Sequence, residues 1–430
     1  MSVRSLGQQD ARLLFLASQA LSDLKADPLP LSHLGLAVSG GGDSMAMLWL
    51  LAPWAREQGI AVSVATVDHG LRPESADEAR FVAEACRDLG VPHTVLLWQG
   101  WDSKGNLQAA AREARLSLLS AWAQDEGIDT LATAHTSDDQ AETFLLRLAR
   151  GSGVDGLAPM VGRRDVKGQR WVRPMLPLTR EELRQWLVHH GHGWREDPSN
   201  ADTRFSRVRA RRALEALEPL GIDQARLHTT AVLLGWAGDA LRQYAVEAAA
   251  RIATVRHGDV SFDYLEFCRL PAETHLRLAS EAIRWVSGAT YRPRLSSLQD
   301  SLVMAGTQPR TLQGTLIRFQ GQRPTGSRLV IGREPRAAAR APSVPTSAFW
   351  DGRWRLTGPH APDLEVRMLG EAGLALCPDW REAGLERSSV LASPAVWRGQ
   401  TLVAAPLAGR AGEWTAEVSK NFLSALNGGG

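Results

Sequence analysis

The sequence predicts an α/β fold with a parallel, doubly wound sheet, followed by a helical domain and a small mixed C-terminal domain. Three observations predict this fold class. Short apolar runs alternate with amphipathic segments over residues 34–151, as in successive strand–helix units. Apolar side chains recur at helical spacing over residues 224–299, and residues 347–430 contain short β-like pieces separated by turns. We therefore expect domains at 1–217, 218–335 and 346–430.

The elements of the first domain follow one another in a regular order. The expected strands are residues 34–38, 60–70, 91–98 and 129–135, which are short and mostly apolar. The expected helices are residues 43–57, 74–90, 106–127 and 137–151. The segment REPRAAARAPSVP, residues 333–345, is typical of a linker. Ligands of such sheets bind beyond the carboxyl ends of the strands, so polar residues at those ends are the first candidates for a site.

The composition is that of an ordinary globular protein: 44% hydrophobic and 22% charged residues, with a net charge of +2. Three distant cysteines form no CxxC pair, which argues against a zinc ribbon or an iron–sulfur cluster and suits a reducing compartment. The N-terminus resembles an amphipathic helix, not a signal peptide, and no apolar run is long enough to span a membrane. We expect a cytoplasmic protein without membrane contact.

A glycine-rich stretch, SGGGDS, directly follows the first expected strand and precedes a helix. Backbone N–H groups at a helix N-terminus bind phosphate, and glycines allow the phosphate to approach closely. The stretch lacks the lysine of a GxxxxGK[ST] loop and is not GxGxxG. The loop residues are therefore candidate phosphate ligands: Ser39, Gly40, Gly41, Gly42, Asp43 and Ser44.

This stretch resembles the S-G-G-x-D-S motif of the ATP pyrophosphatases, or PP-loop proteins. Further segments follow in order, among them VDHGLRPES, NLQAAAREAR, ATAHTSDDQAET and REDPSNADTRFSRVRAR. Together they resemble the tRNA(Ile)-lysidine synthetases over most of residues 34–335. The resemblance implies a PP-loop sheet and a ligase. It would adenylate the wobble cytidine of a tRNA(Ile) with a CAU anticodon, attach L-lysine, and release AMP and pyrophosphate. Related proteins are often dimers, which makes a homodimer an open possibility.

The chemistry gives the candidate residues their roles. The glycine loop would hold the pyrophosphate of ATP, and Asp43 would bind Mg²⁺, because a carboxylate beside phosphates requires a cation; helix capping is its alternative role. Asp68 and His69 end the second strand, where the adenosine would lie. The resemblance assigns Arg115 to the reacting phosphate, although a solvated arginine face shared with Arg112 is the plain alternative.

Three polar residues share one helical face if the helix begins by His135. His135, Asp139 and Glu142 are four and three residues apart. Such a set can be a metal site or an exposed charged face. The resemblance implies instead that these residues bind the lysine substrate.

Thirteen lysines and arginines against six acids lie between residues 163 and 212, a composition suited to RNA phosphates. We expect Arg204, Arg209, Arg211 and Arg212 to contact tRNA. The resemblance places Arg207 in the active site. A solvated basic helix is the alternative for this run.

Two other functions remain open at this level. Another adenylating enzyme, such as a tRNA thiolase or an amidating ligase, would share the glycine loop, although a cytidine thiolase would carry the CxxC pairs that this sequence lacks. A non-catalytic RNA-binding protein could keep the nucleotide fold, but the intact SGGGDS and HTSDDQAET stretches argue against it.

Overall fold

The computed structural model describes residues 7–26, 30–70, 75–99, 107–166, 168–196, 204–321, 326–419 and 421–428. The chain forms two compact units, Met1–Gly238 and Asp239–Gly430. The predicted segments 67–75, 106–115 and 195–211 lie partly outside the described residues. None of the helices within the described ranges combines the length and apolar composition needed to cross a membrane.

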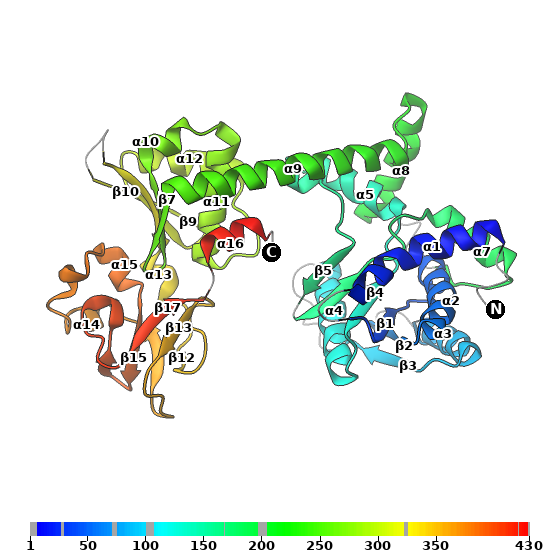
Figure 1. Ribbon diagram of the computed structural model, residues 1–430, viewed down its shortest axis with the longest axis horizontal. Helices are drawn as coiled ribbons and strands as arrows, with labels where there is room; N and C mark the ends of the chain where they lie inside the picture. Colours follow the sequence, from blue (N-terminus) through cyan, green and yellow to red (C-terminus); the bar gives the residue numbers. More distant parts are fainter. Residues whose placement is uncertain are drawn as a thin grey trace. The chain divides into compact units, whose positions relative to one another are not determined.

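The first unit is built on a six-stranded sheet in the order β3-β2-β1-β4-β6-β5 (Figure 1). Its strands are β1 (His33–Ala37), β2 (Ala61–Asp68), β3 (His93–Leu97), β4 (Thr130–Thr133), β5 (Arg163–Val166) and β6 (Gln169–Val172). All neighbouring pairs are parallel except β5 with β6, which form an antiparallel edge. The predicted parallel sheet is thus confirmed. The β5–β6 hairpin extends it beyond the four strands that the sequence indicated.

Helices cover both faces of this sheet. The helices of the first unit are α1 (Gln8–Ser22), α2 (Gly42–Glu57), α3 (Ser75–Leu89), α4 (Leu107–Asp125), α5 (Ser137–Leu148), α6 (Val154–Leu157), α7 (Arg180–His189) and α8 (Ser206–Leu217). One core unites α1, α2, α3 and α7 on one face through residues such as Leu13, Met45 and Leu183. The other face is covered by α4, whose Trp122 packs with Leu131 of β4.

The strand order creates a switch point beside β1. From β1 the chain moves outward through β2 and β3, and it then returns to place β4 on the other side of β1. The loops that leave β1 and β4 therefore diverge. In open α/β sheets, a ligand binds in the crevice between two such loops. The glycine loop follows β1 and His135 follows β4, so both predicted site segments flank this switch point.

The second unit contains more sheet than the helical pattern indicated. The long helix α9 (Gln224–Ile252) is followed by β7 (Ala253–Arg256) and β8 (Asp259–Asp263), so residues 224–299 are not helical throughout. These strands join a five-stranded sheet, β7-β8-β11-β10-β9, with β9 (Arg310–Leu312), β10 (Thr315–Gln320) and β11 (Arg328–Arg333). The helices packed on it are α10 (Tyr264–Arg269), α11 (Ala272–Ser287) and α12 (Leu295–Ala305).

The C-terminal part of this unit is small and mixed. It holds the sheet β12-β14-β15-β16 and the pair β13-β17. These strands are β12 (Val344–Pro345), β13 (Trp354–Thr357), β14 (Glu365–Met368), β15 (Pro394–Arg398), β16 (Thr401–Ala404) and β17 (Thr415–Val418). The short helices are α13 (Pro335–Ala338), α14 (Gly370–Leu374), α15 (Arg387–Leu391) and α16 (Phe422–Asn427).

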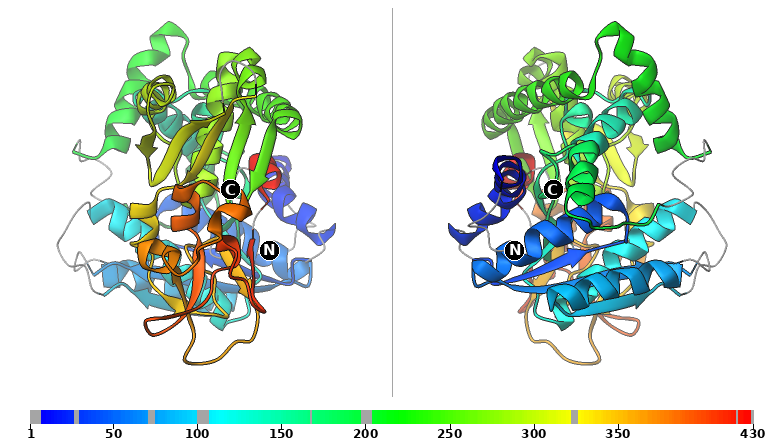
Figure 2. Two further views of the ribbon diagram at one scale, coloured as in Figure 1. Left: turned by 90° about the vertical axis from the view of Figure 1, so that its left-hand side faces the viewer. Right: turned by 90° about the vertical axis from the view of Figure 1, so that its right-hand side faces the viewer.

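Two features join the parts of the second unit. The segment expected to be a linker contains α13, and its Ala338 is fully buried in a core with Trp350; the small alanine side chains allow this close packing. Helix α16, drawn in red in Figure 2, packs into the core of the five-stranded sheet. It does so through Phe422 and Leu426. The division after Gly238 places the five-stranded sheet and the C-terminal part in one unit. The expected division into domains 1–217, 218–335 and 346–430 stays a prediction.

The close packing of β1 yields a test of the core. A Cβ atom on Gly35 would lie 2.7 Å from Leu131 and 3.1 Å from Trp122. Overfilling a packed core costs about 1–3 kcal/mol, so we expect Gly35→Ala to lower the free energy of unfolding of the first unit by this amount in urea titrations. Gly162→Ala is the control, because no atom lies within 4 Å of its new Cβ. Equal stabilities of the two variants would contradict the packing argument.

Candidate active site

The glycine loop between β1 and α2 is shaped by its own backbone and hydroxyl groups. Gly40 has φ = +85°, a conformation that favours glycine. The Ser44 hydroxyl accepts from the Ser39 amide (3.1 Å) and donates to the Gly41 carbonyl (2.9 Å). Helix α2 begins at Gly42, and the first N–H groups of a helix have no partner within it. The two serines thus brace the loop, and the amides that follow can receive a phosphate.

Asp43 does not cap this helix. Gly41 is the N-cap residue, and the described residues provide no side-chain capping hydrogen bond. Asp43 Oδ2 instead accepts from Nε of Arg180 at 3.1 Å, while Asp43 Oδ1 is buried and has no hydrogen-bond partner among the described residues. Burial raises the pKa of Asp43, and the charge of Arg180 opposes this rise. A buried carboxylate oxygen without a donor fits a bound cation.

The acids of α5 form a cluster with Asp43, which we call the acid cluster: Asp43, Asp138, Asp139 and Glu142. Asp139 and Glu142 are 6% and 1% exposed. The α5 helix begins at Ser137 with Thr136 as N-cap, and the Thr136 amide donates to Asp139 Oδ2 at 3.0 Å. His135 therefore precedes the helix and does not share its face. The common helical face considered for His135, Asp139 and Glu142 required the helix to begin by His135, and it begins at Ser137.

Arg180, at the first position of α7, connects the acid cluster. Its guanidinium lies 3.1 Å from Asp43, 3.3 Å from Glu142 and 3.7 Å from Asp139. Its backbone amide donates to Asp138 Oδ2 at 2.8 Å. Burial works against the charge of Arg180, but the surrounding acids raise its pKa. Sequence reasoning missed this residue, because a lone arginine at a helix start carries no motif.

Helix α8 supplies two more cations to the cluster. Arg207 NH1 lies 3.2 Å from Asp139 Oδ1, and Arg211 Nε lies 2.6 Å from Glu142 Oε1. The two arginines are four residues apart and share one helix face. Although burial opposes ionisation, Arg207 leads the favourable contacts that lower the pKa of Asp139. Arg211, expected at the tRNA, thus contacts the same acid as Arg180, whereas Arg204, Arg209 and Arg212 are exposed.

The end of β2 offers a different environment. Asp68 Oδ1 accepts from the hydroxyl of Ser75 (2.6 Å) and the amide of Gly70 (2.8 Å), and these bonds lower its pKa. The neighbouring His69 is half-buried, and burial together with the charge of Arg115 lowers its pKa, so the ring is neutral at pH 7. Within the described ranges of the chain, Nδ1 of His69 is buried and has no hydrogen-bond partner. A neutral imidazole with a free nitrogen can bond to a nucleoside.

His135 lies between the acid cluster and a group of arginines. Its Nδ1 is 3.0 Å from the Thr133 hydroxyl. Burial is the main cause that lowers the pKa of His135 to about 3; Asp139 opposes the shift, and Arg173, Arg115 and Arg207 add to it. His135 is therefore a neutral hydrogen-bonding group and not a base at pH 7. Among the described residues, no group of three or more His, Cys, Asp or Glu could hold a metal ion alone.

Comparison with known proteins gives one family model, two relatives and one solved structure that match this chain. The family model described as "PP-loop domain" matches residues 16–217. The chain is 47% identical to a tRNA(Ile)-lysidine synthase of Ruegeria pomeroyi over 401 residues, 92% of this chain and 94% of that protein. It is 36% identical to that of Wolbachia pipientis, covering 76% of this chain and 77% of the other. A U34-tRNA thiolase from Methanococcus maripaludis aligns with a TM-score of 0.46 at 16% identity, over 53% and 79% of the two chains.

The depressed pKa of His135 predicts a pH dependence of stability. An unfolded histidine has a pKa near 6.5, so between pH 6.5 and about 3 the unfolded chain binds a proton that the folded chain does not. This contribution to stability is complete above pH 6.5 and is lost as the pH falls. Between pH 6.5 and pH 5 the free energy of unfolding should fall by about 1–2 kcal/mol more in the wild type than in His135→Gln. Urea titrations at both pH values measure this difference.

The exposed His228 of α9 provides the control. His228→Gln should follow the wild-type dependence. A loss of stability in His135→Gln that matches the wild type over this range would show that His135 titrates normally.

Proposed function

The chain belongs to the tRNA(Ile)-lysidine synthase family, and from this premise we propose how its residues carry out the reaction. It is a ligase that forms lysidine on tRNA(Ile), and its PP-loop domain takes ATP as substrate. Family membership favours this function over a thiolase, an amidating ligase or a non-catalytic RNA-binding protein. The finer points are proposals: L-lysine as the amino acid, the wobble cytidine of a CAU anticodon as the target, Mg²⁺ as the metal, a cytoplasmic location and a homodimer.

The proposed reaction has two steps. The cytosine O2 attacks the α-phosphorus of ATP, the bond to the β-phosphate oxygen breaks, and pyrophosphate leaves. An amino group of lysine then attacks C2, the C2–O bond breaks, AMP leaves, and the amine gives up its surplus protons to the surroundings. The product changes codon reading and the amino-acid identity of the tRNA. The residues must therefore separate two tasks, holding ATP and holding lysine.

The single observation that carries the proposal is the pair of buried carboxylate oxygens without partners. Asp43 Oδ1 and Glu142 Oε2 are both buried and accept no hydrogen bond from the part of the chain that the structure describes. Asp43 follows the glycine loop, where Mg²⁺ bound also by the ATP phosphates would neutralise charge on the leaving pyrophosphate. Glu142 lies on α5, where a lysine ammonium group would satisfy its free oxygen. The two oxygens thus fit two different cations.

The other residues take supporting roles in this proposal. Asp139, which lies on α5 with Glu142, and His135, whose charge state Asp139 influences, would orient the lysine. Arg180 is a positioning residue, because it holds the acids in place before their ligands arrive. The partly exposed Arg207 can turn from Asp139 toward the adenylate. Asp68 and His69 would bind the adenosine.

Arg115 would contact the transferring phosphate. Arg204, Arg209 and Arg212 are exposed on or just before α8. We propose that these three contact the tRNA backbone and that Arg211, because of its bond to Glu142, serves the acid cluster first.

The glycine loop yields a test of ATP use. ATP should be split to AMP and pyrophosphate, and ADP as product would contradict the assignment. In Gly41→Ala the new Cβ meets only the Ser39 hydroxyl at 3.7 Å, so the fold should be kept. The methyl group would block the phosphate from the amides, and we expect ATP affinity in equilibrium dialysis to fall tenfold or more, a loss of about 1.4 kcal/mol.

Gly153→Ala is the matched control for this variant. Gly153 is also an N-cap residue in extended conformation, and no atom lies within 4 Å of its Cβ position. It should bind ATP as the wild type does. Unchanged ATP affinity in Gly41→Ala would mean that the loop does not receive a phosphate.

Lysine recognition is tested with Glu142→Gln, which keeps size and polarity but removes the charge. A charge-assisted hydrogen bond contributes about 1.5–3 kcal/mol. We therefore expect the KM for lysine to rise tenfold or more. Adenylation should survive, because lysine acts only in the second step. It is measured as label from ATP on tRNA without lysine.

Glu215→Gln, an exposed acid on α8, is the control and should leave the KM for lysine unchanged. If Glu142→Gln abolishes adenylation and leaves this KM unaltered, Glu142 belongs to the ATP site and our division of roles is wrong.

A further inference from the structure

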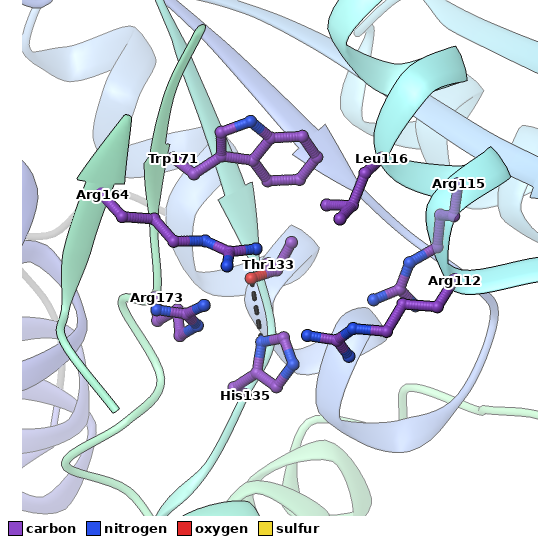
Figure 3. Close-up of a pocket in the computed structure, with 8 residues that line it drawn as sticks. All are labelled: Arg112, Arg115, Leu116, Thr133, His135, Arg164, Trp171 and Arg173. Atoms are coloured by element: carbon purple, nitrogen blue, oxygen red, sulfur yellow. Dashed lines mark hydrogen bonds between the residues drawn. The ribbon is translucent and has the colours of Figure 1, made fainter. Parts of the chain in front are cut away.

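A second charged pocket, distinct from the acid cluster, lies beyond the ends of β4 and β6 (Figure 3). We call it the arginine pocket. Arg112 and Arg115 reach it from α4, Arg164 from β5, and Arg173 from the turn after β6. Its lining residues are Arg112, Arg115, Leu116, Thr133, His135, Arg164, Trp171 and Arg173. Four guanidinium groups thus face one small pocket whose lining contains no carboxylate.

Three of these arginines have a buried nitrogen atom without a hydrogen-bond partner among the described residues. Nε of Arg115, Arg164 and Arg173 is buried in each case and has no hydrogen-bond partner. Arg173 is only 7% exposed and donates from NH1 to the Val161 carbonyl. Burial, followed by repulsion from neighbouring arginines, lowers the pKa of Arg115 and of Arg173 to about 10. Arg115 and Arg173 thus remain charged at pH 7, and like charges held together in a partly buried pocket call for an anion.

The position of the pocket indicates which anion it receives. The glycine loop follows β1, and the proposed adenosine contacts follow β2. Arg173 follows β6 and Arg164 lies on β5, which are two and three strand positions from β1 in the opposite direction. With neighbouring strands about 4.8 Å apart, Arg164 lies roughly 14 Å along the sheet from β1. In the proposed function the glycine loop binds the triphosphate, and the nucleoside extends toward β2, away from the arginine pocket.

Given the proposed function, the substrate that must approach from this side is the RNA. Its target cytosine has to meet the α-phosphate near Arg115, and the phosphodiesters on either side of that nucleotide then lie close by. Guanidinium groups bind phosphate oxygens through two parallel hydrogen bonds. Arginine, more than lysine, suits such a fixed and partly buried site.

We propose that the arginine pocket binds a phosphodiester group of the tRNA beside the target cytidine, with Arg164 and Arg173 as its main ligands. Arg115, at the side of the pocket nearest the nucleotide, links this group to the reacting phosphate. The pocket thereby fixes the cytidine for attack without reading its base. The inference rests on the proposed function, since it requires tRNA as substrate.

The test compares Arg164→Gln with Arg164→Lys, which keeps the charge. Binding of a tRNA(Ile) transcript is measured at several KCl concentrations without ATP or lysine. Loss of one phosphate contact should reduce the slope of log affinity against log salt by about 0.7–0.9 in Arg164→Gln. Arg164→Lys should keep most of the slope, and ATP affinity, measured without tRNA, should stay within twofold of wild type in both variants.

Arg163→Gln removes the same charge from the neighbouring, exposed residue of β5 and should leave the slope unchanged. An unchanged slope in Arg164→Gln, or an equal fall in Arg163→Gln, would overturn the proposal. A loss of ATP affinity in Arg164→Gln would also overturn it and assign the pocket to a nucleotide phosphate. Lysidine formation by the wild-type protein is measured separately, by mass spectrometry of the tRNA. If the wild type forms lysidine, the proposed function holds whatever the Arg164 variants show.

Discussion

The contact of Arg180 with the acid cluster is the constraint on which the site depends. Four carboxylates on two helices would repel one another if they stood alone, and two of them are almost fully buried. Arg180 offsets that repulsion with one guanidinium group and its own backbone amide. Because Asp43, Asp138 and Asp139 lie in the first turns of α2 and α5, the helix dipoles also favour the negative charge of these three acids. The N-termini of α2, α5 and α7 are thereby brought together at the switch point of the sheet.

Around this contact, charge is sorted into two regions. Acids and their paired arginines lie on the side of α5, α7 and α8, while the four arginines of the arginine pocket, which has no carboxylate in its lining, gather over β4, β5 and β6. His135 lies between the two regions and is neutral, because its burial, and after it the charges of the surrounding arginines, lower the pKa of its ring. Such sorting allows cationic and anionic ligands to occupy adjacent places. A mixed arrangement would neutralise itself and bind neither kind.

Much of the fold could be predicted from the sequence, since the strand–helix alternation of residues 34–151 is strongly periodic. The β5–β6 hairpin was missed, because its short strands contain arginines in place of an apolar run. The strands β7 and β8 were missed because they directly follow α9, whose pattern masks them. The glycine loop and the acids could be found from local motifs. Arg180, Arg164 and Arg173 could not, since only the strand order brings them to the site.

The arginine pocket also makes the free energy of unfolding depend on the anions around the protein, because an anion bound there would stabilise the folded form. An anion that binds only the folded form adds RT ln(1 + [L]/Kd) to the free energy of unfolding, about 2.7 kcal/mol at a hundredfold excess over Kd. If the arginine pocket binds a tRNA phosphate as proposed, the folded chain is more stable where tRNA is plentiful than where it is scarce. Since proteases act mainly on unfolded chains, the protein would then be degraded more slowly when its substrate is abundant.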